Sequence, residues 1–300
     1  METSGPLLNT EIGPYRCMQV LGEGINHKLY HAIEPETDRL IALRVIPLNP
    51  HQSDLQYKSA TLVRHIQAIN SAYTVPVIDF GIDDDVLYIA SPDMPGGSLE
   101  SRFKRFHQDK AVHKQGIPWP SLGSALYLVE RIAHALDDVH SAGYVHGLVD
   151  PINIMFDKKG HGYLGELGIS QLTKLIFRLG DTNSLYVSRY AAPELWQGNR
   201  PQPASDQYSL ACLAYELFTG ELPFSGQSIY TLMKQHTEDA VMPPRFVRPE
   251  LPDTLTIPFW RALAKPMEER YGNVGEFVDD LREALPDVAR DVSPFFTEPL

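Results

Sequence analysis

Short apolar or alternating runs, separated by turn signals, fill the first part of the chain to about Pro92. Three of these runs, Tyr15 to Leu21, Leu29 to Glu34 and Leu40 to Leu48, have the length and composition of strands. Gly-Glu-Gly follows the first run and Glu-Pro-Glu-Thr-Asp closes the second, and both are turn signals. The pattern predicts a strand-rich first third.

One helical pattern interrupts these strands between Asp54 and Asn70, where apolar residues recur near one face. Two further apolar runs, Val75 to Phe80 and Val86 to Ala90, flank Asp83-Asp84-Asp85. Three neighbouring aspartates suggest a metal site, but a solvated hairpin turn is the interpretation we favour, because Asp is a common turn residue. The two runs therefore predict a hairpin.

The pattern becomes helical after Gly96-Gly97. A Ser start and repeated apolar positions predict a long amphipathic helix, and Gly220 marks the end of a second, strongly apolar one. The segment Phe103 to Lys114 carries several Lys, Arg and His residues and is interpreted as a loop insertion, whereas residues from Pro286 onward are interpreted as a tail. The predicted helices span Ser121 to His140, Ser205 to Thr219, Pro258 to Leu263 and Val274 to Leu285.

Composition narrows the functional classes. The chain has 300 residues and a net charge of −12, which argues against a large surface for nucleic acid or anionic membrane. Two cysteines, Cys17 and Cys212, cannot form a disulfide framework, and Cys212 lies in an apolar run typical of a buried helix. Met1 to Thr10 lacks the features of a signal peptide, and no apolar run is long enough to span a membrane. We expect a cytoplasmic protein without membrane insertion in this chain.

The most informative segment runs from His146 to Ile154 and reads His-Gly-Leu-Val-Asp-Pro-Ile-Asn-Ile. It resembles the catalytic loop of protein kinases, H-R-D-L-x-x-x-N, in which the Asp is the base and the Asn binds magnesium. Gly147 stands at the Arg position, Leu148 at the Asp position, and Asp150 where a Lys is usual.

Other landmarks of that family follow in the family's order. The whole pattern is similar to the protein kinase superfamily, and in particular to bacterial Hanks-type serine/threonine kinases in a degenerate form. The matching segments are Leu21 to Tyr30 (glycine-rich loop), Ala42 to Arg44 (the strand of the ATP-pairing Lys), Tyr88 to Leu99 (hinge), Glu166 to Gly168 (the D-F-G place), Tyr190 to Glu194 (A-P-E), Ser205 to Phe224 (central helix) and Ala262 to Arg270 (last block).

The resemblance implies an α+β, bilobal fold. It places a small N-lobe with an antiparallel sheet at 1–92 and a larger, mostly helical C-lobe at 93–286, with the hinge near 91–97 and a tail at 287–300. It also implies two structural anchors: a buried ion pair between Glu194 and Arg270, and Asp206 holding the backbone of the catalytic loop.

The chemistry of phosphoryl transfer needs cations for the triphosphate, oxygen ligands for the metal and a base for the acceptor hydroxyl. Measured against the family, Arg44 replaces Lys, Leu148 replaces the base, Asp150 replaces a Lys and Glu166 replaces the metal-binding Asp, whereas Asn153 is kept. Asn153 and Glu166 are the metal candidates of this site, and with Asp150 they could form a rearranged oxygen cluster; we favour solvated or hydrogen-bonded side chains, so no metal site is expected.

These changes suggest lost chemistry. Leu148 cannot accept a proton, a role typically worth about 10²–10⁴-fold in rate, and a carboxylate at Asp150 repels phosphate. The helix that normally donates a Glu to the ATP-pairing Lys contains none, and Leu62 falls near the expected place. Arg44 then either pairs with Glu166 or points outward.

Two further departures concern the activation segment and the glycine-rich loop. Val187 occupies the place of the activation-segment Thr, and Gly147 removes the Arg that receives a phosphorylated segment, so the Ser and Thr residues between 170 and 184 are interpreted as ordinary loop residues. His27 replaces the third glycine of the loop, which adds bulk near the phosphates.

What remains is an apolar, vestigial nucleotide pocket. Pro92 lacks an N–H group, but Met94 keeps both backbone groups for hinge recognition. The pocket positions are Gly22, Gly24, Leu29, Ala42, Arg44, Pro92, Met94 and Met155.

The sequence therefore predicts a protein without enzymatic activity, a signalling scaffold that binds protein partners, with no required cofactor. Two alternatives stay open. One is a regulatory domain that binds ATP without productive Mg²⁺. The other is an atypical phosphoryl or nucleotidyl transferase that uses Arg44, Asp150, Asn153 and Glu166. The segment Phe103 to Trp119, the activation segment and the tail from Pro286 to Leu300 are the candidate partner surfaces.

Overall fold

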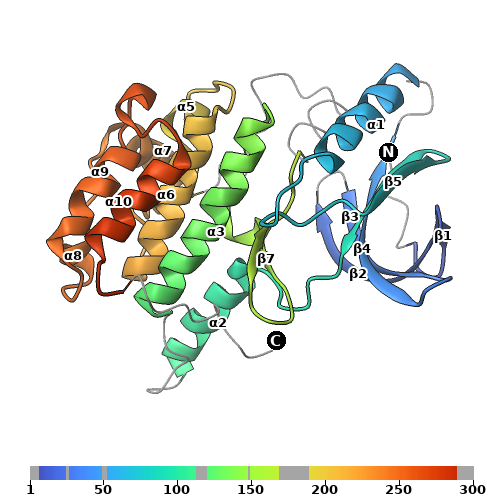
Figure 1. The fold of residues 1–300 in the computed structure, drawn as a ribbon, viewed down its shortest axis with the longest axis horizontal. Helices are drawn as coiled ribbons and strands as arrows, with labels where there is room; N and C mark the ends of the chain where they lie inside the picture. The colour runs from blue at the N-terminus through green and yellow to red at the C-terminus, as the bar shows by residue number, and fades with distance from the viewer. Residues whose placement is uncertain are drawn as a thin grey trace. The chain divides into compact units, whose positions relative to one another are not determined.

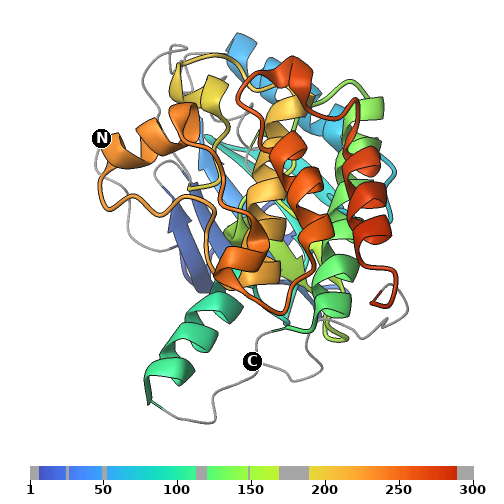
Figure 2. The ribbon, with the colours of Figure 1, turned by 90° about the vertical axis from the view of Figure 1, so that its left-hand side faces the viewer.

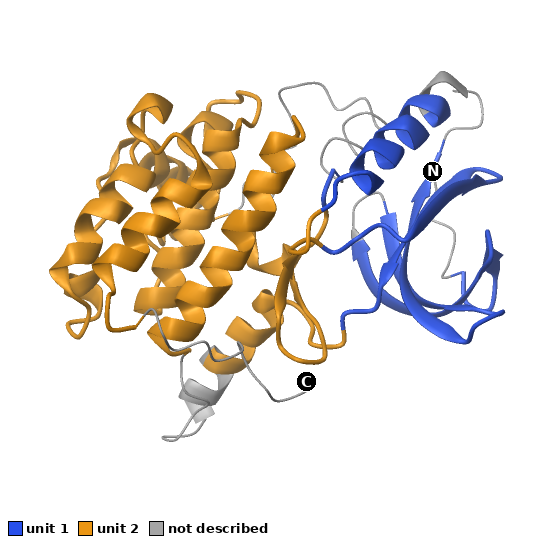
Figure 3. Ribbon diagram, viewed as in Figure 1, with its two compact units in different colours: residues 1–70, 75–94, 167–179 blue, residues 71–74, 95–166, 180–300 orange. Residues whose placement is uncertain are grey.

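The computed structural model describes residues 7–24, 27–48, 53–112, 120–147, 149–168 and 189–288. These residues form two compact units (Figure 3). The first contains the described residues of 1–70 and 75–94, together with Leu167 and Gly168, and the second contains the described residues of 71–74, 95–166 and 189–288. Val187, the Ser and Thr residues of 170–184 and Leu148 lie outside the described residues.

The first unit is built on a six-stranded antiparallel sheet with the order β1-β2-β3-β4-β6-β5. The strands are β1 (Glu11–Ile12), β2 (Tyr15–Gly24), β3 (His27–Glu34), β4 (Arg39–Pro47), β5 (Asp79–Asp83) and β6 (Val86–Pro92), and one helix, α1 (Ser53–Gln67), accompanies them. The sequence patterns predicted four of these strands and α1. The strand predicted at Val75 to Phe80 is wrong: pairing with β6 begins at Asp79 and leaves Asp84-Asp85 as the turn. Pro76 has no N–H group for a ladder, which disfavours a strand there.

The two faces of this sheet bury different side chains because neighbouring residues of a strand point to opposite sides. Leu43 and Val45 of β4 join one cluster with Tyr30 and Cys17. Ile46 joins the other cluster, where α1 contributes Val63 and the partly buried Leu62. Arg44 shares the face of Ile46, the face that α1 covers.

The second unit is mostly helical. Two short strands, β7 and β8, pair in an antiparallel hairpin. The elements are α2 (Leu99–Val112), α3 (Leu122–Ser141), η1 (Pro151–Asn153), β7 (Ile154–Phe156), β8 (Gly162–Leu164), α5 (Pro193–Trp196), α6 (Pro203–Thr219), α7 (Ile229–Glu238), α8 (Pro244–Val247), η2 (Asp253–Leu255), α9 (Thr256–Ala262), η3 (Met267–Glu269) and α10 (Val274–Ala284). In Figures 1 and 2, α6 lies beside α3 and α9, and α10 packs against α3 and α9.

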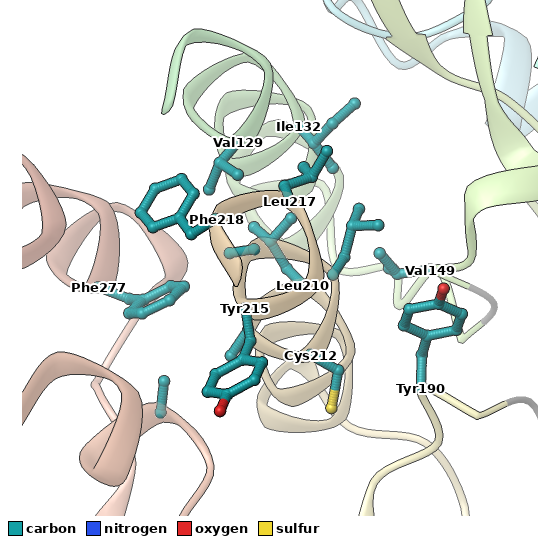
Figure 4. Close-up of a cluster of buried hydrophobic side chains, with 14 of the residues drawn as sticks. Val129, Ile132, Val149, Tyr190, Leu210, Cys212, Tyr215, Leu217, Phe218 and Phe277 are labelled. Atoms are coloured by element: carbon teal, nitrogen blue, oxygen red, sulfur yellow. The ribbon is translucent and has the colours of Figure 1, made fainter. Parts of the chain in front are cut away.

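Helix α6 is buried on all sides, as its apolar sequence predicts. Its side chains Leu210, Cys212 and Phe218 lie among residues of α3 and α10 in one core (Figure 4). Cys212 is fully buried and free, which confirms its predicted place. Gly220 ends the helix with a φ of 85°, a left-handed conformation that glycine adopts at low cost.

The loop insertion predicted at Phe103 to Lys114 is wrong as far as Val112, because α2 runs from Leu99 through Val112, and residues 113–119 lie outside the described residues. Leu99, Phe103 and Phe106 recur at helical spacing and are all buried. Lys104 pairs with Glu100 one turn earlier at 2.9 Å. Lys104 and Arg105, two of the basic residues that suggested a loop, are exposed polar residues of an amphipathic helix. None of the helices in the described part of the chain is both long and apolar enough to cross a bilayer.

Gly96 sets how closely the chain approaches the β7–β8 hairpin. Its N–H donates to Phe156 O at 3.0 Å, and a Cβ at Gly96 would lie 2.6 Å from Asp157 O. Backbone cannot yield as a side chain does, so we expect Gly96→Ala to lower the free energy of unfolding by about 1–3 kcal/mol. Urea denaturation measures this. Gly22→Ala is the control, because a Cβ there meets nothing within 4 Å, and an equal loss in both variants would contradict the explanation.

Candidate functional site

Asp206 of α6 holds the loop that begins at His146. Its carboxylate accepts hydrogen bonds from the backbone N–H groups of His146 at 2.8 Å and Gly147 at 2.7 Å, and His140 Nε2 lies 2.8 Å from Oδ2. Gly147 has a φ of 74°, which glycine adopts without strain. This arrangement confirms the predicted role of Asp206.

Gly165 joins the two candidate metal ligands. Its N–H donates to Asn153 O at 2.7 Å, and its carbonyl lies 2.7 Å from His146 Nε2. Asn153 is therefore tied by backbone to the residue that precedes Glu166. Glu166 has a φ of 61°, an uncommon and strained conformation for a residue with a side chain. The hydrogen bonds of Gly165 fix the backbone next to Glu166, and they do not depend on the length of the Glu166 side chain.

Asp150 is the only carboxylate between His146 and Asn153. It is half-buried and caps η1, because its Oδ1 accepts from Ile152 N at 3.1 Å. The negative charge of Asp150 also acts on a buried pair in which Tyr190 donates a hydrogen bond to Glu216. Burial raises the pKa of Glu216 to about 7, and the negative charge of Asp150 adds to this rise, whereas the Tyr190 bond opposes it. The loop thus holds a negative charge where the family has a positive one.

In the first unit, the residues of the predicted nucleotide pocket line up across three strands. Leu29 pairs with Arg44, and Arg44 pairs with Ile89. Paired residues point to the same side of a sheet, so Leu29 and Arg44 share one face. Arg44 is buried, which is contrary to the alternative that it points outward. Its proposed pairing with Glu166, which belongs to the other unit, stays a prediction.

The remaining pocket positions lie in β2, β4 and β6, in the segment after β6 and, in the second unit, in β7. Ala42 pairs with Ser91, and Gly22 and Gly24 pair with Leu29 and His27. Pro92 ends β6 and Met94 follows it, both partly buried. Met155 lies in β7 and forms a bridge with Ser98.

His27 is neutral in this setting. Burial lowers its pKa to about 4, and the positive charge of Arg44 adds to this decrease. Leu62, at the place expected for the pairing Glu, lies in α1 and packs with the apolar cluster of that face. The face therefore presents one buried cation, Arg44, next to apolar surface.

Two contacts were not found from the sequence. His31 Nε2 lies 2.9 Å from the Asp93 carboxylate, which joins β3 to the segment after β6. Tyr190 and Glu216 form the buried pair beneath the loop. Neither contact has a motif, because each joins residues far apart in the sequence.

The predicted ion pair between Glu194 and Arg270 is present and buried. The guanidinium donates to both carboxylate oxygens, at 3.0 and 2.9 Å, and Ser205 donates to the same carboxylate at 2.6 Å. Three backbone carbonyls accept further hydrogen bonds from the guanidinium, those of Ala264 and Ala204 at 2.9 Å and that of Lys265 at 3.1 Å. Loss of either partner would leave the other charge buried and uncompensated, so both are needed for the stability of the unit that carries the loop.

Known proteins resemble this chain over most of its length. The serine/threonine-protein kinase PknE of Mycobacterium tuberculosis is 30% identical over 94% of the chain and 48% of PknE. The serine/threonine-protein kinase PknH of Mycobacterium bovis is 27% identical over 93% of the chain and 45% of PknH. The chain thus spans about half the length of these curated relatives. The crystal structure of the Mycobacterium tuberculosis PknI kinase domain has the same fold, with a TM-score of 0.66 and 23% identity over 95% of this chain and 100% of that one.

The prediction that the chain is not an enzyme is contradicted by these relatives, which are named serine/threonine-protein kinases. The error has a physical origin. The substitutions at Leu148 and Asp150 were counted as losses against the family pattern. The loop nevertheless keeps the carboxylate of Asp150 and the amide of Asn153, and Asp206 anchors it.

The family itself is settled by a match that spans most of the molecule. The model of the protein kinase domain matches residues 15–279, from β2 to α10. The antiparallel sheet of the first unit and the helices of the second agree with the resemblance drawn from the motifs and with the bilobal α+β class. The chain belongs to the protein kinase domain family.

Proposed function

We propose that this domain transfers a phosphoryl group from ATP to a hydroxyl of a protein, through a rearranged set of residues. The family and the names of the relatives support the reaction class. The same names support a protein acceptor, and the acidic charge and the free, buried cysteines support a cytoplasmic location. We also propose the division into 1–92, 93–286 and a tail at 287–300.

The proton acceptor in this proposal is Asp150. It is the one carboxylate of the loop, and it is half-buried rather than sequestered. A positioned base on the acceptor hydroxyl is typically worth about 10²–10⁴-fold in rate. Asp150 stands two residues after Leu148, the place of the usual base, so its reach toward the hydroxyl differs from the family's.

Magnesium ligands in this proposal are Asn153 and Glu166. Amide and carboxylate oxygens suit a hard cation, and the magnesium ion, when bound, neutralises charge on the phosphates. Within the described ranges no group of three or more His, Cys, Asp or Glu side chains gathers around one point. The two protein oxygens therefore leave the remaining positions to phosphate oxygens and water, as is usual for Mg²⁺.

Arg44 supplies the cation for the phosphates. It is buried on the face that also carries Leu29 and Ala42. A guanidinium remains charged at any physiological pH and binds phosphate oxygens through two parallel hydrogen bonds. The neighbouring His27 is neutral, so Arg44 carries this role without help from the glycine-rich loop.

The observation that carries the proposal is the geometry around Gly165. One residue hydrogen-bonds to the backbone of Asn153, contacts His146 and leads directly into Glu166. Asp206 fixes the other end of the same loop. The base candidate and both metal ligands thus lie on two segments that hydrogen bonds hold together, although two of the three residue types differ from the family's.

A second candidate is a regulatory domain that binds ATP without productive Mg²⁺. The observation that favours it concerns Glu166. Its backbone has a strained, positive φ, and its carboxylate lies one methylene farther from that backbone than the carboxylate of the family's Asp. Magnesium tolerates little displacement of its ligands. In this case nucleotide binding itself would regulate the binding of a protein partner.

A thermal-shift titration separates these two functions. We expect ATP to raise the unfolding temperature, since a ligand at about 100 times its Kd stabilises by about 2.7 kcal/mol. Under the transfer proposal Mg²⁺ or Mn²⁺ increases the shift, and Glu166→Gln removes that increase but keeps the shift from ATP alone. Glu238→Gln, an exposed Glu at the end of α7, is the control. No shift at millimolar ATP would contradict both functions, and a shift indifferent to metal would favour the second.

A further inference from the structure

Three tyrosine rings surround one arginine on the second unit. The guanidinium of Arg131, on α3, lies 5.1 Å from the ring centroid of Tyr73, 5.8 Å from that of Tyr127 and 4.9 Å from that of Tyr163. Each distance is within the range of a cation–π contact. The rings come from three separate segments: the stretch before β5, α3 itself and β8. The fold, and no sequence motif, brings them together.

This cluster is held in one geometry. Arg131 Nε donates to Gly162 O at 2.8 Å, and Leu164 N donates to Tyr73 O at 2.9 Å. Gly162 packs so tightly on α3 that a Cβ there would lie 2.2 Å from Leu128 Cδ1. Among the described residues, neither terminal nitrogen of Arg131 donates a hydrogen bond to another part of the chain. The guanidinium is oriented and keeps two donors for a ligand.

The surroundings of the cluster are basic and accessible. Tyr127, Arg131 and His134 form a stripe at helical spacing on α3, and the exposed His134 stacks on Tyr73 at 5.1 Å. The turn between β7 and β8 adds the exposed Lys158 and Lys159. This is unusual on a chain of net charge −12.

Two of the nearby acids, Glu130 and Asp157, are engaged with other groups. Glu130 binds Arg282 at 2.9 Å. Asp157 accepts hydrogen bonds from the N–H groups of Lys159 at 2.8 Å and His161 at 2.9 Å. Asp138, one turn beyond His134 on α3, marks the acidic end of the stripe. Among the described residues, no carboxylate forms an ion pair with Arg131, Lys158 or Lys159.

We infer that this Arg131 surface, formed by Tyr73, Tyr127, Arg131, Tyr163, Lys158 and Lys159, docks an acidic linear segment of a partner protein. One carboxylate of the segment binds the terminal nitrogens of Arg131 in the bidentate manner of arginine, and a following carboxylate lies near the two lysines. Tyr and Arg are the residues most enriched at the energetic centre of protein interfaces. The pre-set guanidinium lowers the entropy lost on binding. Docking needs neither nucleotide nor transfer, so it goes beyond the function proposed above.

Fluorescence anisotropy of a labelled peptide of repeated Glu-Glu-Leu, without nucleotide, tests this inference. We expect saturable binding to the whole chain that weakens with salt. The double variant Lys158→Glu/Lys159→Glu should weaken it at least about tenfold, because reversed charges repel the segment. Arg131→Gln should weaken it similarly. The lysine variant keeps the result interpretable if Arg131→Gln disturbs the hairpin.

The matched control is Lys104→Glu/Lys234→Glu, two exposed lysines on α2 and α7 that change the net charge by the same amount. It should leave the affinity within about twofold of the unchanged chain, since distant exposed charges are screened. Equal weakening by both double variants, or no binding at millimolar peptide, would overturn the inference. Tighter binding of a labelled oligothymidine than of the peptide would also overturn it, in favour of a nucleic-acid surface.

Discussion

Asp150→Asn should lower the rate of phosphate transfer to a protein substrate by about 10²–10⁴-fold, the usual effect of removing a positioned base. Asn keeps the shape of Asp and an oxygen that accepts the hydrogen bond of Ile152, so the cap of η1 survives. The loop anchors at His146 and Gly147 do not involve Asp150. The loss should therefore fall on kcat, with the KM for ATP and the unfolding temperature nearly unchanged.

Two variants make this prediction specific. Asp287→Asn changes an exposed Asp after α10 and should leave the rate unchanged. Leu148→Asp restores the family's residue at the usual place and should raise the rate of the Asp150→Asn variant. Rates are measured from labelled ATP with enzyme in excess. If Asp150→Asn transfers phosphate as fast as the unchanged chain, Asp150 is not the base.

The largest expected loss of stability comes from Arg270→Met. Its side chain is fully buried, and the change leaves the Glu194 carboxylate buried without its partner. Burial by itself raises the pKa of Glu194, but the hydrogen bonds and charge of Arg270 outweigh it and hold that pKa below the usual value. Breaking such a pair costs about 3–5 kcal/mol. Urea denaturation at neutral pH measures it.

The pH dependence follows from the same pair. The pKa of Glu194 is lower in the folded protein than in the unfolded chain. The ionised carboxylate therefore stabilises the fold at pH values above its unfolded pKa, and this contribution is lost as the pH falls through its folded pKa. Arg270→Met should therefore lose less stability at acidic pH than at neutral pH. Arg245→Met breaks an exposed pair with Asp253 and should cost less than about 1 kcal/mol. Equal losses in the two variants would contradict the account.

Much of the fold follows from local patterns. Ser121 caps α3, Gly220 ends α6, and the apolar spacing gives both helices their buried faces. The predictions failed where local signals conflicted. In α2, the basic residues suggested a loop although the segment is an amphipathic helix. The strand predicted from Val75 begins too early, because pairing with β6 begins at Asp79.

In the candidate site, only the residues that belong to family motifs could be predicted from the sequence. Asp206, Asn153 and Glu166 were found because the family's spacing marks them. The link through Gly165 and the pair of Tyr190 with Glu216 depend on tertiary contacts between distant residues. The absence of enzymatic activity was predicted wrongly for a related reason: a residue that differs from the family's was equated with a missing group. A functional group that a protein supplies from a different position than its family does forms no motif that one sequence can reveal.

The most direct measurement of the central claim is the formation of ADP and phosphoprotein by the unchanged chain. The chain is incubated with ATP, a mixed protein substrate and either Mg²⁺ or Mn²⁺, and the products are quantified by mass spectrometry. We predict ADP in equal amount to phosphate on serine or threonine, and neither product without metal. ATP binding with no ADP above the level of a chain-free sample, in either metal, would contradict it.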